Sequence, residues 1–234
     1  MVATLAEARR GFALARRRTV LAALGIALAA AMLSAALVVA DGLGLGFDRA
    51  ARAADLPDVI VRFDPESAQQ VANRIAALPD LAGYSLRLEL TNVGVAAGDQ
   101  SRDDAVAEVV GSGRRRGYAV VAGHDLPPTG SDVLLEPAFA EAWHVRLGSA
   151  FSVQGLGREK VIGFAEAPDN VGFPLAKPRF YVSRQAIDAR FGAEANPQVN
   201  LAEIWLRDPR YLNEVLVQAR ATSFGLTDIR PSDR

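Results

Sequence analysis

The feature that most constrains this chain is an uncharged apolar run at residues 19–40, TVLAALGIALAAAMLSAALVVA. As an α-helix, its 22 residues would extend roughly 33 Å, which is enough to cross the hydrocarbon core of a bilayer. Arg16, Arg17 and Arg18 precede the run and Asp41 follows it. Because positive residues stay on the cytoplasmic side, we predict a transmembrane helix with a cytoplasmic N-terminus and an extracytoplasmic bulk.

Two alternatives compete with this membrane anchor. One is a buried helix of a soluble core, where uncharged runs of this length are rare. The other is a cleaved signal: residues 17–21 (RRTVL) loosely fit a twin-arginine signal, and residues 38–40 (VVA) resemble a cleavage site. Signal apolar regions are usually shorter, which favours the retained anchor. Both the anchor and the signal would place residues beyond about 41 outside the cytoplasm.

The charge distribution also divides the chain. Residues 1–18 carry five arginines and one glutamate, a net charge of +4, whereas the rest carries −5, giving −1 overall. A nearly neutral chain argues against nucleic-acid binding. We interpret residues 1–18 as a cytoplasmic basic arm and residues 19–53 as the transmembrane helix and a stalk. The arm is either amphipathic and in contact with membrane lipid, through Leu5 and Phe12, or a frayed tail.

The composition beyond the stalk is that of a folded domain. Half of the residues are apolar and 23% are charged, so a packed core is expected. The chain has no cysteine, which excludes disulfides, thiolate zinc sites and thiol catalysis.

Two segments of this domain resemble each other. Residues 58–78 and 201–221 each read as an apolar strand, then Asp-Pro, then a helix. We predict that Asp64 and Asp208 cap these helices. Their apolar faces would consist of Val71, Ala72, Ile75 and Leu78, and of Leu212, Val215, Leu216 and Ala219.

Each of these helices is followed by a predicted strand. These strands cover residues 85–91, with leucines 86, 88 and 90 on one side, and residues 226–229. Two such units predict an α+β fold with a ferredoxin-like lobe made of residues 54–96 and 196–234.

Residues 97–195 would then form an inserted β-rich lobe. We predict strands at residues 105–110, 118–122, 151–154, 161–164 and 180–182, helices at 136–143 and 183–191, and polar loops at 97–104 and 125–131.

Several short motifs occur in a familiar order. They are RRRTVLAALGI at residues 16–26, SDVLLE at 131–136, FA at 139–140, VRLGS at 145–149, VIGF at 161–164 and FYVS at 180–183. Over essentially its whole length the chain resembles the first part of an FtsX-like, MacB-type ABC transporter permease. Ser149 departs from the pattern, because aspartate is common at that position in the family.

The resemblance implies a permease subunit, or its N-terminal part, in a bacterial inner membrane. It implies a first membrane helix, a periplasmic domain with a ferredoxin-like and an inserted lobe, and three further membrane helices. It also implies a separate ABC ATPase subunit, a permease homo- or heterodimer and, as a further candidate, a periplasmic or membrane-fusion partner. The expected function is export or extraction of a lipid, lipoprotein, peptide or drug, with the outer domain transmitting ATPase-driven motion.

Two other functions remain open at this point. No second uncharged apolar run follows residue 41, so the chain could act as a single-span, membrane-anchored binding or adaptor module without transport activity. An exported enzyme released by signal cleavage is the third hypothesis.

Residues with catalytic or metal-binding chemistry are few, and we predict no catalytic, cofactor-binding or metal site. His124 and His144 are 20 residues apart, without paired ligand spacing. Serines 112, 131, 149 and 152 lack the GxSxG context of a nucleophile. Glycines 42, 44 and 46 resemble a dinucleotide fingerprint but follow a predicted membrane span instead of a strand.

Three groups of charged or aromatic residues receive structural interpretations. Asp103, Asp104 and Glu108 would form a solvated acidic edge or, alternatively, a weak cation site. Arginines 114–116 would form a solvated hairpin tip, with anionic headgroups or a partner protein as alternative contacts. Trp143 and Trp205 are expected in the core or in a contact between lobes.

Overall fold

The structure, a computed structural model, describes residues 56–127, 130–167, 172–221 and 226–231. The predicted basic arm (1–18) and the predicted transmembrane helix and stalk (19–53) lie outside these residues. Within the described ranges, no helix is long and apolar enough to cross a membrane. Residues 50–234 form one compact unit, to which everything described below belongs.

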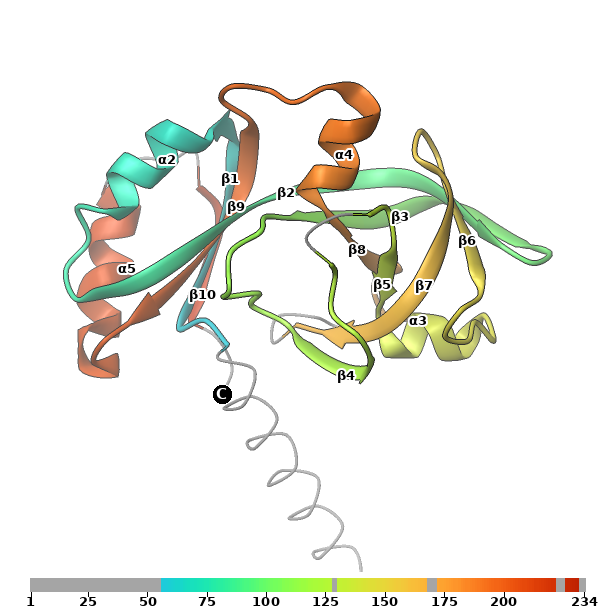
Figure 1. The fold of residues 1–234 in the computed structure, drawn as a ribbon. Coiled ribbons are helices and arrows are strands. Elements are labelled where there is room, and N and C mark those ends of the chain that lie inside the picture. Colours follow the sequence, from blue (N-terminus) through green and yellow to red (C-terminus); the bar gives the residue numbers. More distant parts are fainter. Residues whose placement is uncertain (1–55, 128–129, 168–171, 222–225, 232–234) are drawn as a thin grey trace, which may run out of the picture. The chain divides into compact units, whose positions relative to one another are not determined.

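The unit is built on a 10-stranded sheet in the order β10-β1-β9-β2-β3-β8-β5-β7-β4, with β6 pairing both β2 and β7 (Figure 1). The strands are β1 (Val59–Ser67), β2 (Leu81–Ala97), β3 (Gln100–Val110), β4 (Ala119–Gly123), β5 (Val133–Leu135), β6 (Ala150–Val153), β7 (Gly157–Glu166), β8 (Arg179–Ser183), β9 (Gln198–Leu206) and β10 (Leu226–Pro231). The helices are α2 (Ala68–Ile75), α3 (Pro137–Ala142), α4 (Arg184–Phe191), the 3-10 helix η1 (Pro209–Tyr211) and α5 (Leu212–Ala221). This sheet-rich mixture agrees with the predicted α+β class.

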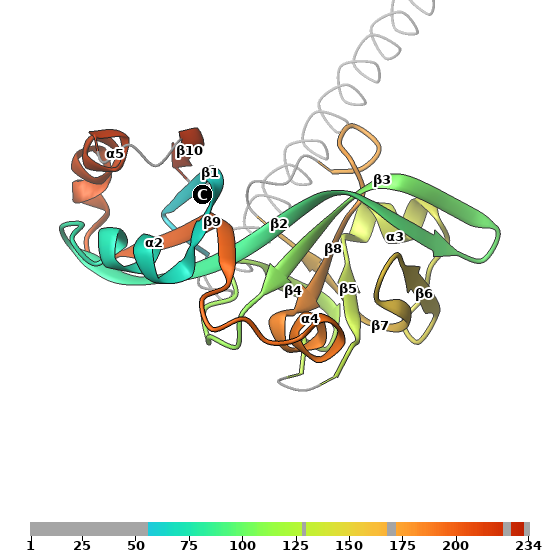
Figure 2. The ribbon, with the colours of Figure 1, turned by 90° about the horizontal axis from the view of Figure 1, so that it is seen from above.

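Four strands, β10-β1-β9-β2, form an antiparallel half of the sheet. Helix α2 connects β1 to β2, and α5 connects β9 to β10, so the chain order is two strand–helix–strand units. Both helices pack on the same face of these strands, where Val71, Ile75 and Val215 are buried with Val61 and Ile204 (Figures 1 and 2). The apolar faces predicted for both helices are therefore confirmed.

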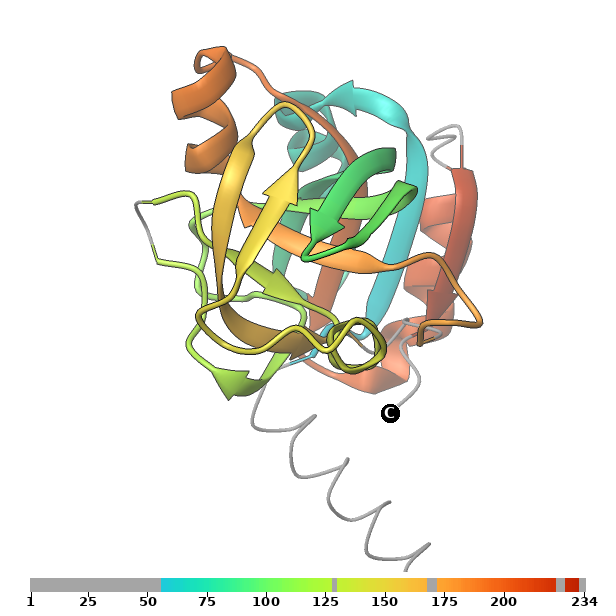
Figure 3. The same ribbon diagram turned by 90° about the vertical axis from the view of Figure 1, so that its right-hand side faces the viewer.

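Strands β3, β5, β6, β7 and β8 close into a barrel together with β2, and β4 pairs with β7 alone. The pairs β2–β3, β3–β8, β8–β5, β5–β7, β7–β6 and β6–β2 return to the strand from which they start. In Figure 3 the green β2–β3 hairpin lies at the front beside the yellow β6 and β7. The barrel interior is filled by apolar side chains, among them Val95, Ala107, Val109, Val133, Phe151, Val161, Phe180 and Val182. Phe139 from α3 joins this cluster.

Strand β2 belongs to both halves. Its first part, up to Arg87, pairs with β9, whereas Arg87 to Ala97 pair with β3. One strand thus runs across the predicted boundary between the lobes. The division into a ferredoxin-like lobe (54–96 and 196–234) and an inserted lobe (97–195) stays a prediction.

Two of the predictions of local structure are wrong. Asp64 does not cap a helix: β1 continues to Ser67, and the hydroxyl of Ser67 caps α2 by accepting a hydrogen bond from Gln70 N at 3.4 Å. The Asp-Pro pair instead lies where the β1–β9 register shifts, between Arg62 and Glu66. Proline is tolerated at such a bulge because it offers no N–H to the ladder.

The predicted polar loop at 97–104 is mostly strand. Strand β2 ends at Ala97 and β3 begins at Gln100, so only two residues form the turn, of which Gly98 has φ 57°. The short buried strand β5 was not predicted. The other predicted strands and helices are confirmed with shifted ends, and Asp208 caps η1 through a hydrogen bond from Arg210 N at 2.9 Å.

The barrel core generates the first testable prediction. Phe151 is fully buried, and its ring lies 5.6 Å from that of Phe180. Phe151→Ala should lower the free energy of unfolding by about 3–5 kcal/mol, because it removes buried area and leaves a cavity. Leu175→Ala, at a side chain that is 87% exposed, should change it by less than about 0.5 kcal/mol. Chemical denaturation of both variants measures these changes. Equal changes in the free energy of unfolding would contradict the placement of Phe151 in a packed barrel core.

Candidate functional site

Both histidines lie just after secondary-structure elements. His124 follows β4 and His144 follows α3, and both are exposed. In the described part of the chain, no group of three or more His, Asp or Glu side chains is placed to hold a metal ion.

Two residues of the sequence motifs have clear structural roles beside α3. Glu136 is buried and accepts a hydrogen bond from Phe173 N at 2.9 Å, which ties the segment before β8 to the start of α3. Burial raises the pKa of Glu136 in spite of this hydrogen bond. The Ser149 hydroxyl accepts from Arg146 N at 3.1 Å, so it closes the turn before β6 as an aspartate carboxylate could. Of the other serines considered, Ser112 and Ser152 are exposed.

The most distinctive polar feature is a chain of ion pairs that crosses the sheet, which we call the charged seam. Its members alternate in charge and are contributed by β1, β2, β3, β8 and β9: Arg62, Glu89, Arg179, Glu108, Arg87 and Glu203. Side chains alternate between the two faces of a strand: the neighbours of Arg62 and Glu203 pack under α2 and α5, whereas those of Glu108 and Arg179 fill the barrel. The seam therefore lies on the face opposite these helices.

The seam is most deeply buried around Arg87. Its guanidinium contacts Glu108 Oε2 at 2.5 Å and Glu203 Oε2 at 2.8 Å, and all three residues are at most 2% exposed. Burial alone would lower the pKa of Arg87, but the charges of Glu203 and Glu108 outweigh it and raise the pKa above its usual range. Arg87 is thus a permanent cation that fixes two carboxylates from different strands.

Arg179 occupies the middle of the seam. Glu89 and Glu108 are directly opposite each other in the β2–β3 register, an arrangement in which like charges repel. Nη1 of Arg179 lies 3.1 Å from Glu89 Oε2 and also contacts Glu108 Oε1. One guanidinium therefore neutralises a repulsive cross-strand pair.

The outer end of the seam is less buried. Arg62 contacts Glu89 Oε2 at 3.4 Å and Asp228 of β10 at 3.8 Å. Asn200 of β9 secures this end through the backbone: its Oδ1 accepts from Glu89 N at 2.7 Å, and its Nδ2 donates to Glu89 O at 2.9 Å. All four strands β10, β1, β9 and β2 therefore contact this end of the seam.

The segment between β3 and β4 covers the buried end. Tyr118 places its ring 5.4 Å from the Arg87 guanidinium carbon and donates to Asp125 Oδ1 at 2.7 Å. Burial and this hydrogen bond raise the pKa of Tyr118, so the phenol stays a neutral donor. Gly117, with φ 63°, lies against the Glu203 carboxylate, which occupies the space of a Cβ.

The predicted solvated hairpin tip at arginines 114–116 is wrong for two of the three. Arg114 is exposed. Arg115 lies over the buried Trp205, 5.1 Å from the ring centroid. Arg116 contacts Asp125 at 2.9 Å and donates to the Gly111 carbonyl at 2.5 Å. The predicted core positions of Trp205 and Trp143 are confirmed, the latter half-buried against the barrel core.

The predicted acidic edge is wrong for Glu108 alone, since Asp103 is exposed and Asp104 is partly exposed. Asp104 pairs with the partly exposed Arg102 at 2.7 Å, whereas Glu108 is buried and held by two arginines. Glu108 therefore belongs to the seam and not to a surface cation site. A signal for this was present: single glutamates interrupt the apolar runs AVAEVV (105–110) and LAEIWL (201–206).

A substitution in the middle of the seam tests its energetic role. Arg179→Met should lower the free energy of unfolding by roughly 3 kcal/mol, because it removes the one cation that two facing carboxylates share. Arg210→Met is the matched control, since that side chain is 89% exposed, and should cause no measurable change. Chemical denaturation of Glu108→Gln and of the double variant that combines it with Arg179→Met completes a double-mutant cycle. Additivity of the two changes would contradict direct coupling.

A glycine pair tests the cover over the seam. Gly117→Ala should destabilise the chain by more than about 1–2 kcal/mol, because it combines a left-handed backbone conformation with overlap on Glu203. Gly113→Ala, in the same segment, has open space around its Cβ position and should be nearly neutral. Thermal denaturation of both variants tests this prediction. An unchanged melting temperature of Gly117→Ala would contradict the close packing of Gly117 against Glu203.

Comparisons with known proteins identify the fold. Neither protein-family models nor curated protein sequences give a significant match. Among solved structures, the periplasmic region of MacB from Actinobacillus actinomycetemcomitans aligns over 75% of this chain and 88% of that chain, at 12% identity and a TM-score of 0.50. The extracellular domain of the noncanonic ABC-type transporter YknZ from Gram-positive bacteria aligns over 75% of this chain and 98% of that chain, at 9% identity and a TM-score of 0.49. The described part of this chain therefore has a fold similar to that of the periplasmic region of MacB.

Proposed function

We propose that this chain is a permease chain of a MacB-type ABC transporter in a bacterial inner membrane, with its described domain outside the cytoplasm and its N-terminal arm in the cytoplasm. The observation that carries the proposal is the combination of a MacB-like fold at residues 56–231 with an uncharged apolar run at residues 19–40 behind three arginines. Fold alone does not define function, but the two features together match one arrangement of anchor and outer domain.

In this role the domain acts as a mechanical element. ATP binding by a separate ABC ATPase subunit would bring two permease chains together, and the first helix would carry the motion outward as a lever. The charged seam supports this role, because buried ion pairs connect β9 of the four-stranded half to β3 and β8 of the barrel. The cargo we propose is a lipid, lipoprotein, peptide or drug, and a periplasmic or membrane-fusion protein is a further partner.

The absence of cysteine permits a direct test of topology. Single cysteines at Leu175, which is 87% exposed, and at Ala3 of the arm introduce the only thiols in the chain. In intact cells, a membrane-impermeant maleimide should label Leu175→Cys at once and Ala3→Cys only after permeabilisation. Labelling of both sites, or of Ala3→Cys alone, would overturn the extracytoplasmic placement.

The partner is tested separately. The tagged full chain, expressed in its native host and purified in mild detergent, should co-purify with an ABC ATPase subunit identified by mass spectrometry. An unrelated single-span membrane protein with the same tag is the control. Recovery of the chain in the membrane fraction without any ABC ATPase would contradict the permease role and favour the anchored binding or adaptor module.

A further inference from the structure

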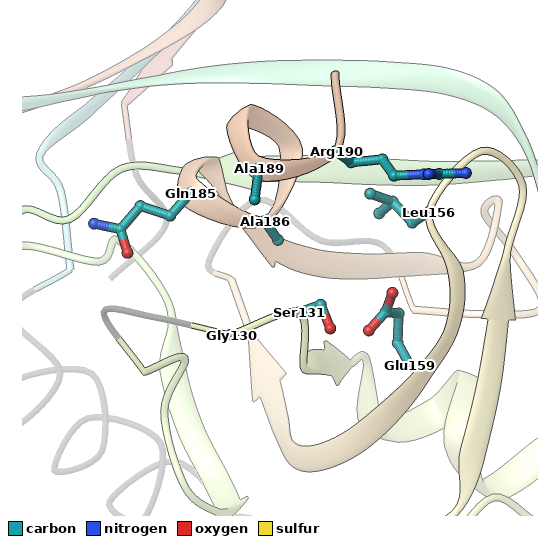
Figure 4. A pocket seen from close by; sticks show the side chains of 8 residues that line it. All are labelled: Gly130, Ser131, Leu156, Glu159, Gln185, Ala186, Ala189 and Arg190. Atoms are coloured by element: carbon teal, nitrogen blue, oxygen red, sulfur yellow. The ribbon is translucent and has the colours of Figure 1, made fainter. Parts of the chain in front are cut away.

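A hollow of about 370 Å³ lies between α4, β7 and the segment that precedes β5 (Figure 4). Its lining includes Ser131, Leu156, Glu159, Ala186, Ala189 and Arg190. Glu159 and Val161 point to the same face of β7, and Val161 and Leu156 pack with the barrel core. The hollow is therefore at the rim of the barrel, and barrel mouths are a common location for small-molecule sites.

Glu159 is the unusual residue of this hollow. It is only 7% exposed, and no hydrogen bond or ion pair joins its carboxylate to another residue in the described part of the chain. Figure 4 shows this carboxylate directed into the hollow, toward Ser131. The buried Glu108 and Glu136, by contrast, each accept a hydrogen bond. A carboxylate that faces an enclosed hollow is stabilised by a counter-ion, so Glu159 points to a cation supplied from outside.

Hydrogen bonds hold the segments around Glu159 in place. The Ser183 hydroxyl accepts from Ala186 N at 3.1 Å and donates to the Gly130 carbonyl at 3.2 Å, so the start of α4 is tied to the segment that carries Ser131. The Arg190 Nε donates to the Gly155 carbonyl at 3.1 Å. Arg190 is the one arginine among the lining residues. This contact holds its guanidinium on the side of Leu156 that faces away from Glu159 (Figure 4).

The lining has the chemistry for an amphipathic cation. One carboxylate and one hydroxyl, from Glu159 and Ser131, can accept N–H hydrogen bonds from an ammonium group. Leu156, Ala186 and Ala189 offer an apolar wall for a short alkyl stem. A metal ion fits less well, because the hollow has a single carboxylate and cations such as calcium prefer six or more oxygen ligands.

We propose that this hollow binds a small primary aliphatic amine, with its ammonium group paired to Glu159 and its alkyl stem against Leu156, Ala186 and Ala189. The site is independent of the proposed permease role, because it uses only residues of the folded domain and requires neither an ATPase nor a second chain.

The test uses the full chain in nanodiscs of zwitterionic phosphatidylcholine, with pentan-1-amine as the probe and calorimetry as the readout. The wild-type chain should bind the amine saturably at pH 7, and pentan-1-ol, which has the same stem without the charge, should bind at least about tenfold more weakly. Glu159→Gln should weaken amine binding by at least about tenfold. Glu166→Gln, an exposed glutamate on the same strand, is the matched control and should bind like wild type.

Two further measurements separate amine binding from effects on the fold. Ala189→Leu should fill the hollow and abolish binding without changing any charge. Glu159→Gln should melt at the same or a higher temperature than wild type, because the carboxylate has no hydrogen-bond or ion-pair partner to lose in the described part of the chain. The proposal is overturned by absence of saturable amine binding to wild type, by equal binding to Glu159→Gln, or by equal binding of the alcohol. A melting temperature of Glu159→Gln several degrees lower would also overturn it, because the carboxylate would then have a structural partner.

Discussion

The structure depends on the burial of Arg87 between Glu108 and Glu203. The guanidinium has no access to water, and its charge is tolerated only because carboxylates from β3 and β9 lie within 2.5 and 2.8 Å. Buried ion pairs add little net stability compared with apolar packing, but they are costly when one partner is missing. A slip of β2 by one residue would turn Arg87 to the opposite face. The pair therefore specifies the register in which β2 lies between its two neighbours.

This constraint links the two halves of the domain. Strand β2 pairs with β9 in the antiparallel half and with β3 and β6 in the barrel. The ion pairs of the seam connect the same two halves a second time, through side chains. Tyr118 and Gly117, from the segment between β3 and β4, pack against the buried end of the seam. For a domain that is proposed to pass on motion from a membrane helix, such double attachment favours movement as one body over bending at β2.

Much of the fold was predictable from periodicity, but the seam was not. The faces of α2 and α5 follow from apolar residues at helical spacing, because packing against a sheet requires one apolar stripe. The alternation of leucines 86, 88 and 90 correctly indicated a strand but implied solvent for Arg87 and Glu89. Their burial depends on Arg179, 90 residues from Glu89 in sequence, and on other strands brought over β2 by the tertiary fold. The hollow beside Glu159 likewise combines residues from three separate segments.

We infer that the charged seam makes the antiparallel half and the barrel one cooperative unit. Hydrogen–deuterium exchange of the full chain, compared between wild type and Arg87→Met, tests it most directly. In Arg87→Met, peptides from β9 (Gln198–Leu206) and from β8 (Arg179–Ser183) should lose protection together and to a similar extent, because both halves depend on the same buried cation. Loss of protection confined to one half, with the other unchanged, would contradict it.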